Sequence, residues 1–105
     1  MSSTAKASST LTPKQRRHLR GLSHKLKPIV MLGNAGLTEN ILSEIDLGLG
    51  HHELIKVRIS GMERDQRTAA SQEICRKTGC QLVNSIGHIA VLYRPATPPR
   101  ITLPG

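Results

Sequence analysis

The chain has 105 residues, which is enough for one domain with a core of its own. It contains no apolar run near the roughly eighteen residues of a membrane-spanning helix, and its first thirty residues lack the apolar segment of a secretory signal. We therefore expect a cytoplasmic protein without a membrane partner. The only cysteines, Cys75 and Cys80, are too few for a disulfide framework and lack zinc-site spacing, so we expect two reduced thiols, no metal and no cofactor.

The positive charge is concentrated in the first part of the chain. The formal net charge is +8, and residues 1–38 contribute +7 of it, because they hold seven lysines and arginines and no acidic residue. A solvated surface normally intersperses the two signs, so this asymmetry indicates a polyanionic partner. Nucleic acid fits better than a membrane surface, because the chain has no Trp or Phe to insert into lipid.

The first predicted element is a helix that begins at Pro13. Thr12 is placed as its N-cap, Pro13 takes the first helical position, and Gln15 can complete a capping box. We expect the helix to end at Leu26 or Lys27. All its basic residues would lie outside a narrow buried stripe. The residues expected on that stripe are Gln15, Leu19, Leu22 and Leu26.

A strand and a second helix are predicted next. Pro28 ends the first helix, and the continuous apolar run Ile29–Leu32 is typical of a buried strand. Apolar residues then recur at helical spacing from Leu37 to Leu49, which predicts a helix. We expect Gly48 and Gly50 to close it, because glycine is common just after a helix.

The rest of the chain predicts a strand, a helix and a hairpin. Leu54–Ile59 is β-branched and alternating, as in a half-buried strand. Glu63–Thr78 is charged, rich in alanine and followed by Gly79, which predicts a capped helix. Gln81–Asn84 and Ile89–Arg94 are two more strands, and their short connection predicts an antiparallel hairpin.

The order α-β-α-β-α-β-β predicts an α/β fold, a four-stranded mixed sheet with three helices. The two strand-helix-strand units would be right-handed crossovers between parallel neighbours, and the hairpin would add one antiparallel strand. We expect the domain to span residues 11–95. The tail 1–10 lacks an apolar pattern and is expected to be disordered, and the Pro-rich tail 96–105 is expected to be extended.

Three stretches carry a resemblance to a known family: LTPKQRRHLRGLSHKLKPIVMLGNAGLT, HELIKVRI and GHIAVLYRP. They resemble the CRM domain of the YhbY type, a small RNA-binding fold of bacterial ribosome-maturation proteins and plant organelle splicing factors. The resemblance implies the same order of elements, similar in plan to the C-terminal domain of the third bacterial translation initiation factor. It also implies association with precursors of the large ribosomal subunit and no catalytic activity. It does not extend to either tail.

The loop Gly33-Asn34-Ala35-Gly36 is the first candidate site. Two glycines let the backbone turn tightly and approach a ligand, and the free N–H groups of the following helix turn can bind phosphate. KH domains clamp nucleic-acid backbone with a G-x-x-G loop. Many strand-to-helix turns need two glycines for geometry alone, and Glu39 would repel a close phosphate. The neighbouring strand, helix and cationic segment nevertheless favour a backbone clamp.

Basic side chains are the second candidate. Three of them, Lys56, Arg58 and Arg94, are as well explained as ordinary exposed sheet residues. Tyr93 is the only aromatic residue, so the chain cannot build an aromatic platform for bases, and we expect recognition of RNA backbone and shape. Six more basic residues form a run with no acid among them: Lys14, Arg16, Arg17, Arg20, Lys25 and Lys27.

We therefore expect a monomeric, non-enzymatic protein that binds ribosomal RNA in an immature large subunit and takes no small-molecule substrate. Two alternatives stay open. His51 and His52 could serve a small ribonuclease, although no nucleophile with an orienting partner and no metal spacing supports this. A protein-interaction module on the ribosome is the other alternative, and it predicts no binding to naked RNA.

Overall fold

The computed structural model describes residues 11–33 and 35–104. The predicted tail at 1–10 and Asn34 of the glycine loop lie outside the described residues. Within these ranges the predicted order of three helices and four strands is confirmed. The elements are α2 (Pro13–Ser23), β1 (Pro28–Leu32), α3 (Glu39–His52), β2 (Leu54–Ile59), α4 (Arg64–Thr78), β3 (Gln81–Ile86) and β4 (Ile89–Tyr93).

The strands form one mixed sheet in the order β1-β2-β4-β3. β1 pairs parallel with β2, and β4 pairs antiparallel with both β2 and β3. The mixed sheet was predicted, but the prediction that the second crossover joins parallel neighbours is wrong, because β4 lies between β2 and β3. β4 is the more apolar strand and buries four of its five residues in the interior of the sheet, whereas the more polar β3 occupies an edge.

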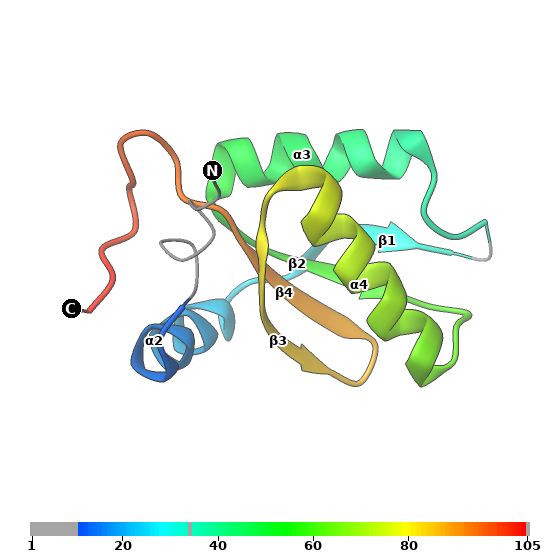
Figure 1. Ribbon diagram of the computed structural model, residues 1–105, viewed down its shortest axis with the longest axis horizontal. Coiled ribbons are helices and arrows are strands. Elements are labelled where there is room, and N and C mark those ends of the chain that lie inside the picture. The colour runs from blue at the N-terminus through cyan, green and yellow to red at the C-terminus, as the bar shows by residue number, and fades with distance from the viewer. Residues whose placement is uncertain (1–10, 34, 105) are drawn as a thin grey trace, which may run out of the picture.

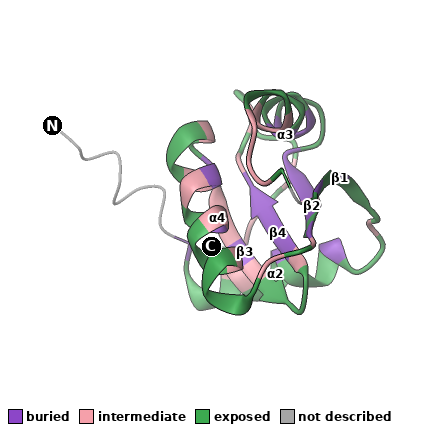
Figure 2. Cartoon of the chain, turned by 90° about the vertical axis from the view of Figure 1, so that its right-hand side faces the viewer, coloured by how far each residue is buried: buried purple, intermediate pink, exposed green. Residues whose placement is uncertain are grey.

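Helices cover the two faces of the sheet unequally. α3 and α4 lie together on one face, and α2 lies across one end of the other face (Figure 1). On the first face, Ile45 of α3 and Ile74 of α4 pack against strand residues such as Ile55. On the second face, Leu19 of α2 packs with Val91 and its neighbours. Figure 2 shows that burial is concentrated in the central strands β2 and β4.

Helix α2 begins as predicted but ends earlier. The capping box is present: Gln15 N–H donates to the Thr12 hydroxyl oxygen, and Thr12 N–H donates to the Gln15 side chain, both at 3.1 Å. The helix ends at Ser23, because the chain turns there, with Leu26 N–H donating to the Ser23 carbonyl at 3.0 Å, and brings Leu26 onto the sheet. Leu22, predicted to be buried, is 41% exposed, and Ser23 is buried in its place.

Strand β1 lies at an edge of the sheet and alternates in burial. Val30 and Leu32 are buried on the α3 side, whereas Ile29 is 48% exposed and Met31 is 64% exposed. The prediction of a continuously buried strand is therefore wrong for two of its residues. Met31 faces away from α3, because a helix covers β1 on one face only; Ile29, at an irregularity of the β1–β2 pairing between Pro28 and Val30, reaches Gly48 of α3 but stays half exposed at the edge of the sheet.

Helix α3 runs through both glycines that were predicted to close it. Gly48 lies where a Cβ atom would come within 2.7 Å of Ile29 Cδ1, so its role is close packing of α3 against β1. The helix ends at His52, and Glu53 follows with a φ of +63°. Among the described residues, every helix is too short or too polar to cross a membrane.

The remaining elements form largely as predicted. Gly79 ends α4 in the left-handed conformation, with a φ of +76°. Strand β3 extends two residues beyond the predicted Asn84, which leaves Gly87 and His88 as the hairpin turn. Cys75 and Cys80 are free thiols, as predicted, with their sulfur atoms 3.5 Å apart.

The segment after β4 has no helix or strand but packs against the domain. Ile101 and Leu103 contact the apolar cluster on the α2 face. The backbone N–H and Nε of Arg100 donate to Glu53 Oε2 at 2.7 and 2.9 Å, and Ile101 N–H donates to Oε1 at 3.2 Å. This Pro-rich segment, expected to be a tail beyond the domain, is therefore tied to the end of α3.

Glu53 is a buried anionic anchor for that segment. Burial of the Glu53 carboxyl raises its pKa. Hydrogen bonds from Arg100 and Ile101 and the charge of Arg100 together lower the pKa by more than burial raises it, so the pKa lies below its ordinary value. A pKa that is lower in the folded state means that ionisation of Glu53 stabilises the fold above the unfolded-state pKa. This stabilisation is lost as the pH falls through the folded-state pKa.

Glu53→Gln should lower the free energy of unfolding by about 1–3 kcal/mol at neutral pH, because the amide loses charge-assisted hydrogen bonds and turns an NH₂ group toward donors. Glu44→Gln, an exposed position on α3, is the control and should change it by less than about 0.5 kcal/mol. Urea denaturation measures both. The effect of Glu53→Gln should be constant above about pH 5.5 and should shrink as the pH falls below the unfolded-state pKa of the carboxyl and through its lower folded-state pKa, where the wild-type carboxylate becomes protonated. An effect that does not change with pH would contradict this assignment.

Candidate nucleic-acid interface

The glycine loop forms a tight, accessible turn. Gly36 N–H donates to the Gly33 carbonyl at 2.9 Å, and Gly36 has a φ of +76°, in the left-handed region that favours glycine. Gly33 and Ala35 are exposed. A Cβ atom on Gly33 would have no neighbour within 4 Å. The turn itself therefore requires glycine at 36, whereas nothing in the surrounding fold requires it at 33.

The start of α3 offers a phosphate less than the sequence predicted. The Thr38 hydroxyl accepts a hydrogen bond from Ile41 N–H at 3.2 Å, so one of the free donors of the first turn is already used. The Glu39 carboxylate is exposed in the same turn. It already interacts favourably with the positive end of the helix dipole, where a phosphate would otherwise bind. The accessible backbone at this end is that of the loop.

The loop and helix α2 do not lie side by side. Lys27 precedes the first residue of β1 and Gly33 follows the last, and the five residues of the strand span about 16 Å. Figure 1 shows α2 at one end of the sheet and the loop at the other. The expectation that the glycine turn lies directly against the cationic helix is therefore wrong.

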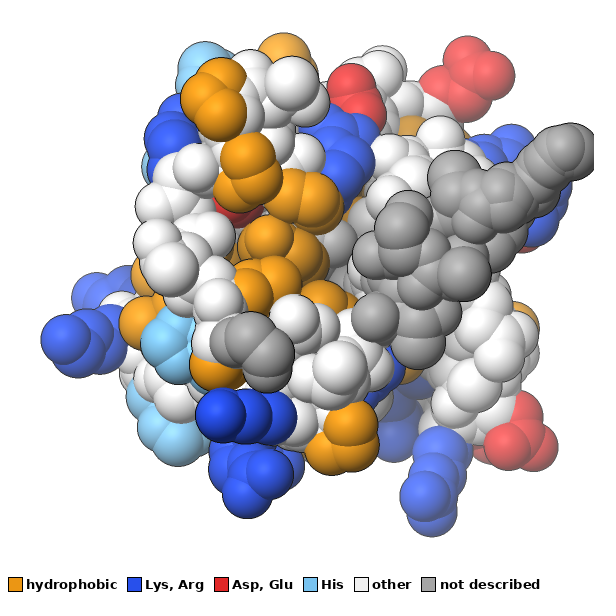
Figure 3. Space-filling model, turned by 60° about the vertical axis from the view of Figure 1, so that its left-hand side comes forward, with side chains coloured by type: hydrophobic (Ala, Val, Ile, Leu, Met, Phe, Trp, Pro, Cys, Tyr) orange, Lys and Arg blue, Asp and Glu red, His pale blue; other side chains and the backbone are white. Residues whose placement is uncertain are grey.

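The basic residues of the first segment divide into two groups. Arg16 is half-buried, and its guanidinium donates to the carbonyls of Leu82 and Val83, which fixes α2 to β3. The others are exposed, and within the described residues none of them forms an ion pair. Lysine and arginine side chains stand out along the lower edge of Figure 3, where α2 lies. These exposed cations are Lys14, Arg17, Arg20, Lys25 and Lys27.

Two of the three sheet cations face the same side as α2. Lys56 Nζ donates to the Leu26 carbonyl at 3.1 Å and so joins β2 to the segment after α2. Arg58, two residues further along the same strand, is exposed. Alternate residues of a strand share a face, so both lie on the α2 face of the sheet. Arg58 lies beyond the part that α2 covers.

Arg94 lies elsewhere and is already occupied. Its Nη1 donates to Asp46 Oδ1 at 2.6 Å and to the Thr78 carbonyl at 2.8 Å. These bonds connect the end of β4 with α3 and α4. Arg94, which was predicted to extend the RNA-binding surface, is therefore not part of the candidate surface.

A row of side chains crosses the α2 face of the sheet at the end where the glycine loop lies. Arg58 pairs in register with Met31 on one side and Ile89 on the other, and Ile89 pairs with Ile86. Residues paired across strands point to the same face. Met31 and Ile86 are 64% and 60% exposed. Ile89 is half-buried against the apolar cluster of the α2 face, and Arg58 is exposed. This open row, Met31-Arg58-Ile89-Ile86, was missed in the sequence because it depends on which strands are neighbours.

The histidine pair of the ribonuclease alternative does not form a recognisable catalytic group. The rings of His51 and His52 are exposed at the end of α3, with centroids 6.2 Å apart and planes tilted by 55°. Among the described residues, no cluster of three or more potential metal ligands occurs. Acid and base catalysis also needs a group that orients the histidines, and within residues 11–33 and 35–104 the two exposed rings have only each other as an aromatic neighbour.

An α/β sheet with one face half open, an exposed glycine turn and a cationic helix defines a small binding module for a polyanion. The CRS1 / YhbY (CRM) domain matches residues 11–94 of the chain. The chain belongs to this family.

Relatives of the chain agree with this assignment. A Haemophilus influenzae protein named as an RNA-binding protein is 50% identical over 95 residues, which cover 90% of this chain and 96% of the relative. A Pseudomonas aeruginosa protein named as a probable RNA-binding protein is 40% identical over 93 residues, with 89% of each chain covered. The solution structure of a hypothetical Staphylococcus aureus protein, described as a candidate RNA-binding protein, superimposes with a TM-score of 0.79 at 36% identity, covering 90% of this chain and all of the other.

Arg16 and Arg17 provide a test of the division between structural and exposed cations. Arg16→Ala should lower the free energy of unfolding by about 1–2 kcal/mol, because two carbonyls of β3 lose a charged donor. Arg17→Ala, its exposed neighbour, should change it by less than about 0.5 kcal/mol. Chemical denaturation of both variants gives the comparison. Equal stability of the two would show that Arg16 does not hold α2 to the sheet.

Proposed function

We propose that the protein is a non-enzymatic RNA-binding protein that contacts the sugar-phosphate backbone. The observation that carries the proposal is the set of exposed α2 cations in a segment without an acidic residue. Unpaired cations on one surface attract a polyanion and release its counterions on binding. The names of the relatives support RNA as that polyanion.

The RNA follows the open face of the sheet from α2 to the glycine loop in this proposal. Arg17 and Arg20 contact phosphates at one end, Arg58 contacts the backbone in the middle, and the loop backbone at Gly33 receives it at the other end. The separation of α2 and the loop supports an extended contact rather than a single point, because one RNA strand must reach both. Arg16, Lys56 and Arg94 hold the fold together and contribute less.

The RNA we propose is ribosomal RNA of an immature large subunit, which would make the protein a cytoplasmic assembly factor that acts as a monomer. This finer assignment rests on the resemblance carried by the stretches 11–38, 52–59 and 87–95. The absence of an aromatic platform in the sequence supports structured RNA, which is recognised by shape and backbone.

The salt dependence of binding tests the cationic surface. If about five phosphates are neutralised, the logarithm of the affinity should fall against the logarithm of salt concentration with a slope of roughly 3.5–4.5. The triple variant Arg17→Gln, Arg20→Gln, Arg58→Gln should reduce that slope by about 2–3, since each lost phosphate contact removes roughly 0.7–0.9. Fluorescence anisotropy with a labelled ribosomal RNA fragment measures both.

Arg76→Gln is the control for this experiment, because Arg76 lies on α4, on the other face of the sheet, and is paired with Glu73. It should leave the slope within about 0.5 of the wild-type value. A wild-type affinity that does not depend on salt would refute the proposed mechanism. Binding only to intact ribosomal particles, and not to naked RNA, would favour a protein-interaction module.

Gly33→Asp tests the loop separately. The added side chain meets no protein atom within 4 Å of its Cβ, and Gly33 is not in the left-handed region, so the melting temperature should stay near the wild-type value. RNA affinity should fall by about tenfold or more, because a carboxylate would face the phosphates there. Gly50→Asp is the control. It adds the same charge at an exposed position of α3 that is not part of the proposed RNA-binding surface. Equal affinities of the two variants would remove the loop from the interface.

A further inference from the structure

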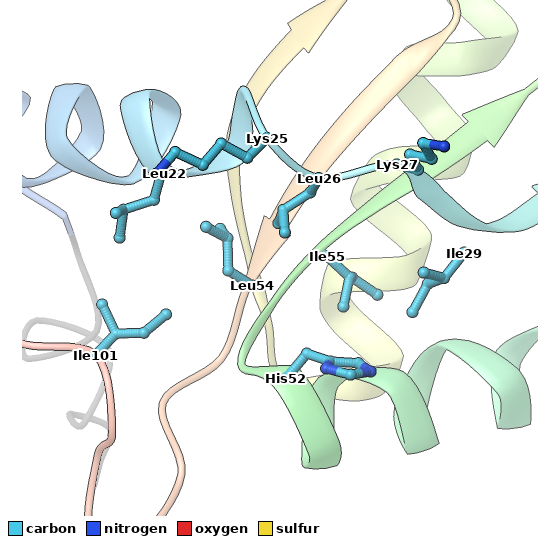
Figure 4. Close-up of a pocket in the computed structure, with 9 residues that line it drawn as sticks. All are labelled: Leu22, Lys25, Leu26, Lys27, Ile29, His52, Leu54, Ile55 and Ile101. Atoms are coloured by element: carbon cyan, nitrogen blue, oxygen red, sulfur yellow. The ribbon is translucent and has the colours of Figure 1, made fainter.

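An apolar groove lies between the end of α2 and the end of α3 and borders the exposed cations Lys25 and Lys27 (Figure 4). Its volume is about 420 Å³, which is within the range of roughly 300–1,000 Å³ of small-molecule sites. Leu22, Ile29 and Leu54 line its apolar part. Lys25 and Lys27 lie along one rim, and His52 lies on the opposite wall.

The groove exists because two apolar residues that the sequence pattern would bury remain uncovered. Leu22 is 41% exposed and Ile29 is 48% exposed. α2 turns Leu19 and Ser23, rather than Leu22, toward the sheet, and Ile29 lies on the edge strand β1. Neither residue belongs to the two buried clusters of the core. Such apolar surface, rimmed by charge, commonly marks a binding site.

The charges around the groove restrict its ligand. Lys25 and Lys27 are exposed and belong to the segment without acidic residues. Glu53, the acidic residue adjacent to His52 in the chain, is buried and bonded to Arg100, so it does not oppose them. A ligand that fits must therefore carry an apolar surface close to negative charge.

A nucleotide meets this requirement within one covalent unit, because each base of an RNA is flanked by two phosphates. We propose that the groove receives one unstacked base of the bound RNA, with its flanking phosphates at Lys25 and Lys27. The base lies between Leu22 at one end of the groove and Ile29 at the other, in dispersion contact with the apolar wall that Leu26 and Leu54 form between them, and the His52 ring lies beside its polar edge (Figure 4). This inference rests on the proposed function and adds a base-reading site to a surface otherwise limited to backbone.

An apolar side chain of an acidic protein segment would satisfy the same chemistry less directly. It would need separate acidic residues placed for Lys25 and Lys27, whereas RNA bound along α2 already brings phosphates to this end of the helix. Structured RNAs also present single unstacked bases in bulges and loops, which is where proteins read them. The occupant of the groove is therefore a base from an RNA bulge.

The test compares two RNA hairpins that differ only in one bulged nucleotide. 2-Aminopurine is placed at the bulge in one hairpin and paired in the stem of the other. The wild-type protein should bind the bulged hairpin about five- to tenfold more tightly, at the lower end of what stacking of one base contributes. The fluorescence of the bulged 2-aminopurine should change on binding, and that of the paired one should not.

The double variant Leu22→Gln, Ile29→Gln keeps the net charge and replaces side chains that are already about half exposed. This variant should bind both hairpins with the affinity that the wild-type protein has for the hairpin with the paired 2-aminopurine. The preference for the bulged hairpin and the fluorescence change on binding should both be lost. Leu47→Gln, on the part of α3 away from the groove and 63% exposed, should keep both. Circular dichroism during heating checks that each variant is folded.

The outcomes separate the two proposals. Equal wild-type affinity for both hairpins would overturn the base site while leaving backbone binding intact, and it is the result expected if the groove holds a protein side chain. A preference for the bulge that persists in the folded double variant would also overturn it. Binding of neither hairpin would refute the proposed function itself.

Discussion

The docking of α2 across one end of the sheet is the constraint on which the functional surface depends. Leu19 is completely buried in this contact. Arg16 bonds to two carbonyls of β3, and Lys56 of β2 bonds to the Leu26 carbonyl after the helix. Because the helix reaches across only one end, it leaves the rest of that face open and carries its exposed cations along the boundary. A longer α2 or a rotated one would cover the open row or turn its cations away.

The same contact explains why the basic residues are not equivalent. A guanidinium or ammonium group that already donates to backbone carbonyls replaces water there and stabilises the fold, whereas one that is only solvated can exchange its counterion for a phosphate. Arg16 and Lys56 belong to the first kind, and Arg17, Arg20 and Arg58 to the second. Net charge alone cannot make this division, because it counts both kinds equally.

The sequence predicted those features that depend on local chemistry. The capping box of Thr12, the alternation of Leu54–Ile59 and the glycine after Thr78 each specify their element without help from distant residues. The place of β4 between β2 and β3 depends on competition among strands for the buried positions, which no local pattern records. Gly48 was interpreted as a helix end because its actual neighbour, Ile29, is nineteen residues away in the chain.

Candidate site residues show the same division. The exposed glycine turn and the cationic segment could be found from residue type and spacing. Their separation by the length of β1 was already implied by chain order, because the predicted strand Ile29–Leu32 lies between Lys27 and Gly33; the direction in which α2 crosses the sheet was not. The open row and the groove were also out of reach, since they consist of residues that look like core.

Backbone contacts and a single base site would serve different purposes on this surface. Phosphates occur at every nucleotide, so contacts with Arg17 or Arg20 attract RNA without selecting one part of it. An apolar groove cannot accept a base that is paired and stacked in a helix, because removing it from the stack costs several kcal/mol. It therefore favours places where the base is already free. On this view, the charges supply most of the affinity, and the uncovered Leu22 and Ile29 supply the discrimination between a regular helix and an interrupted one.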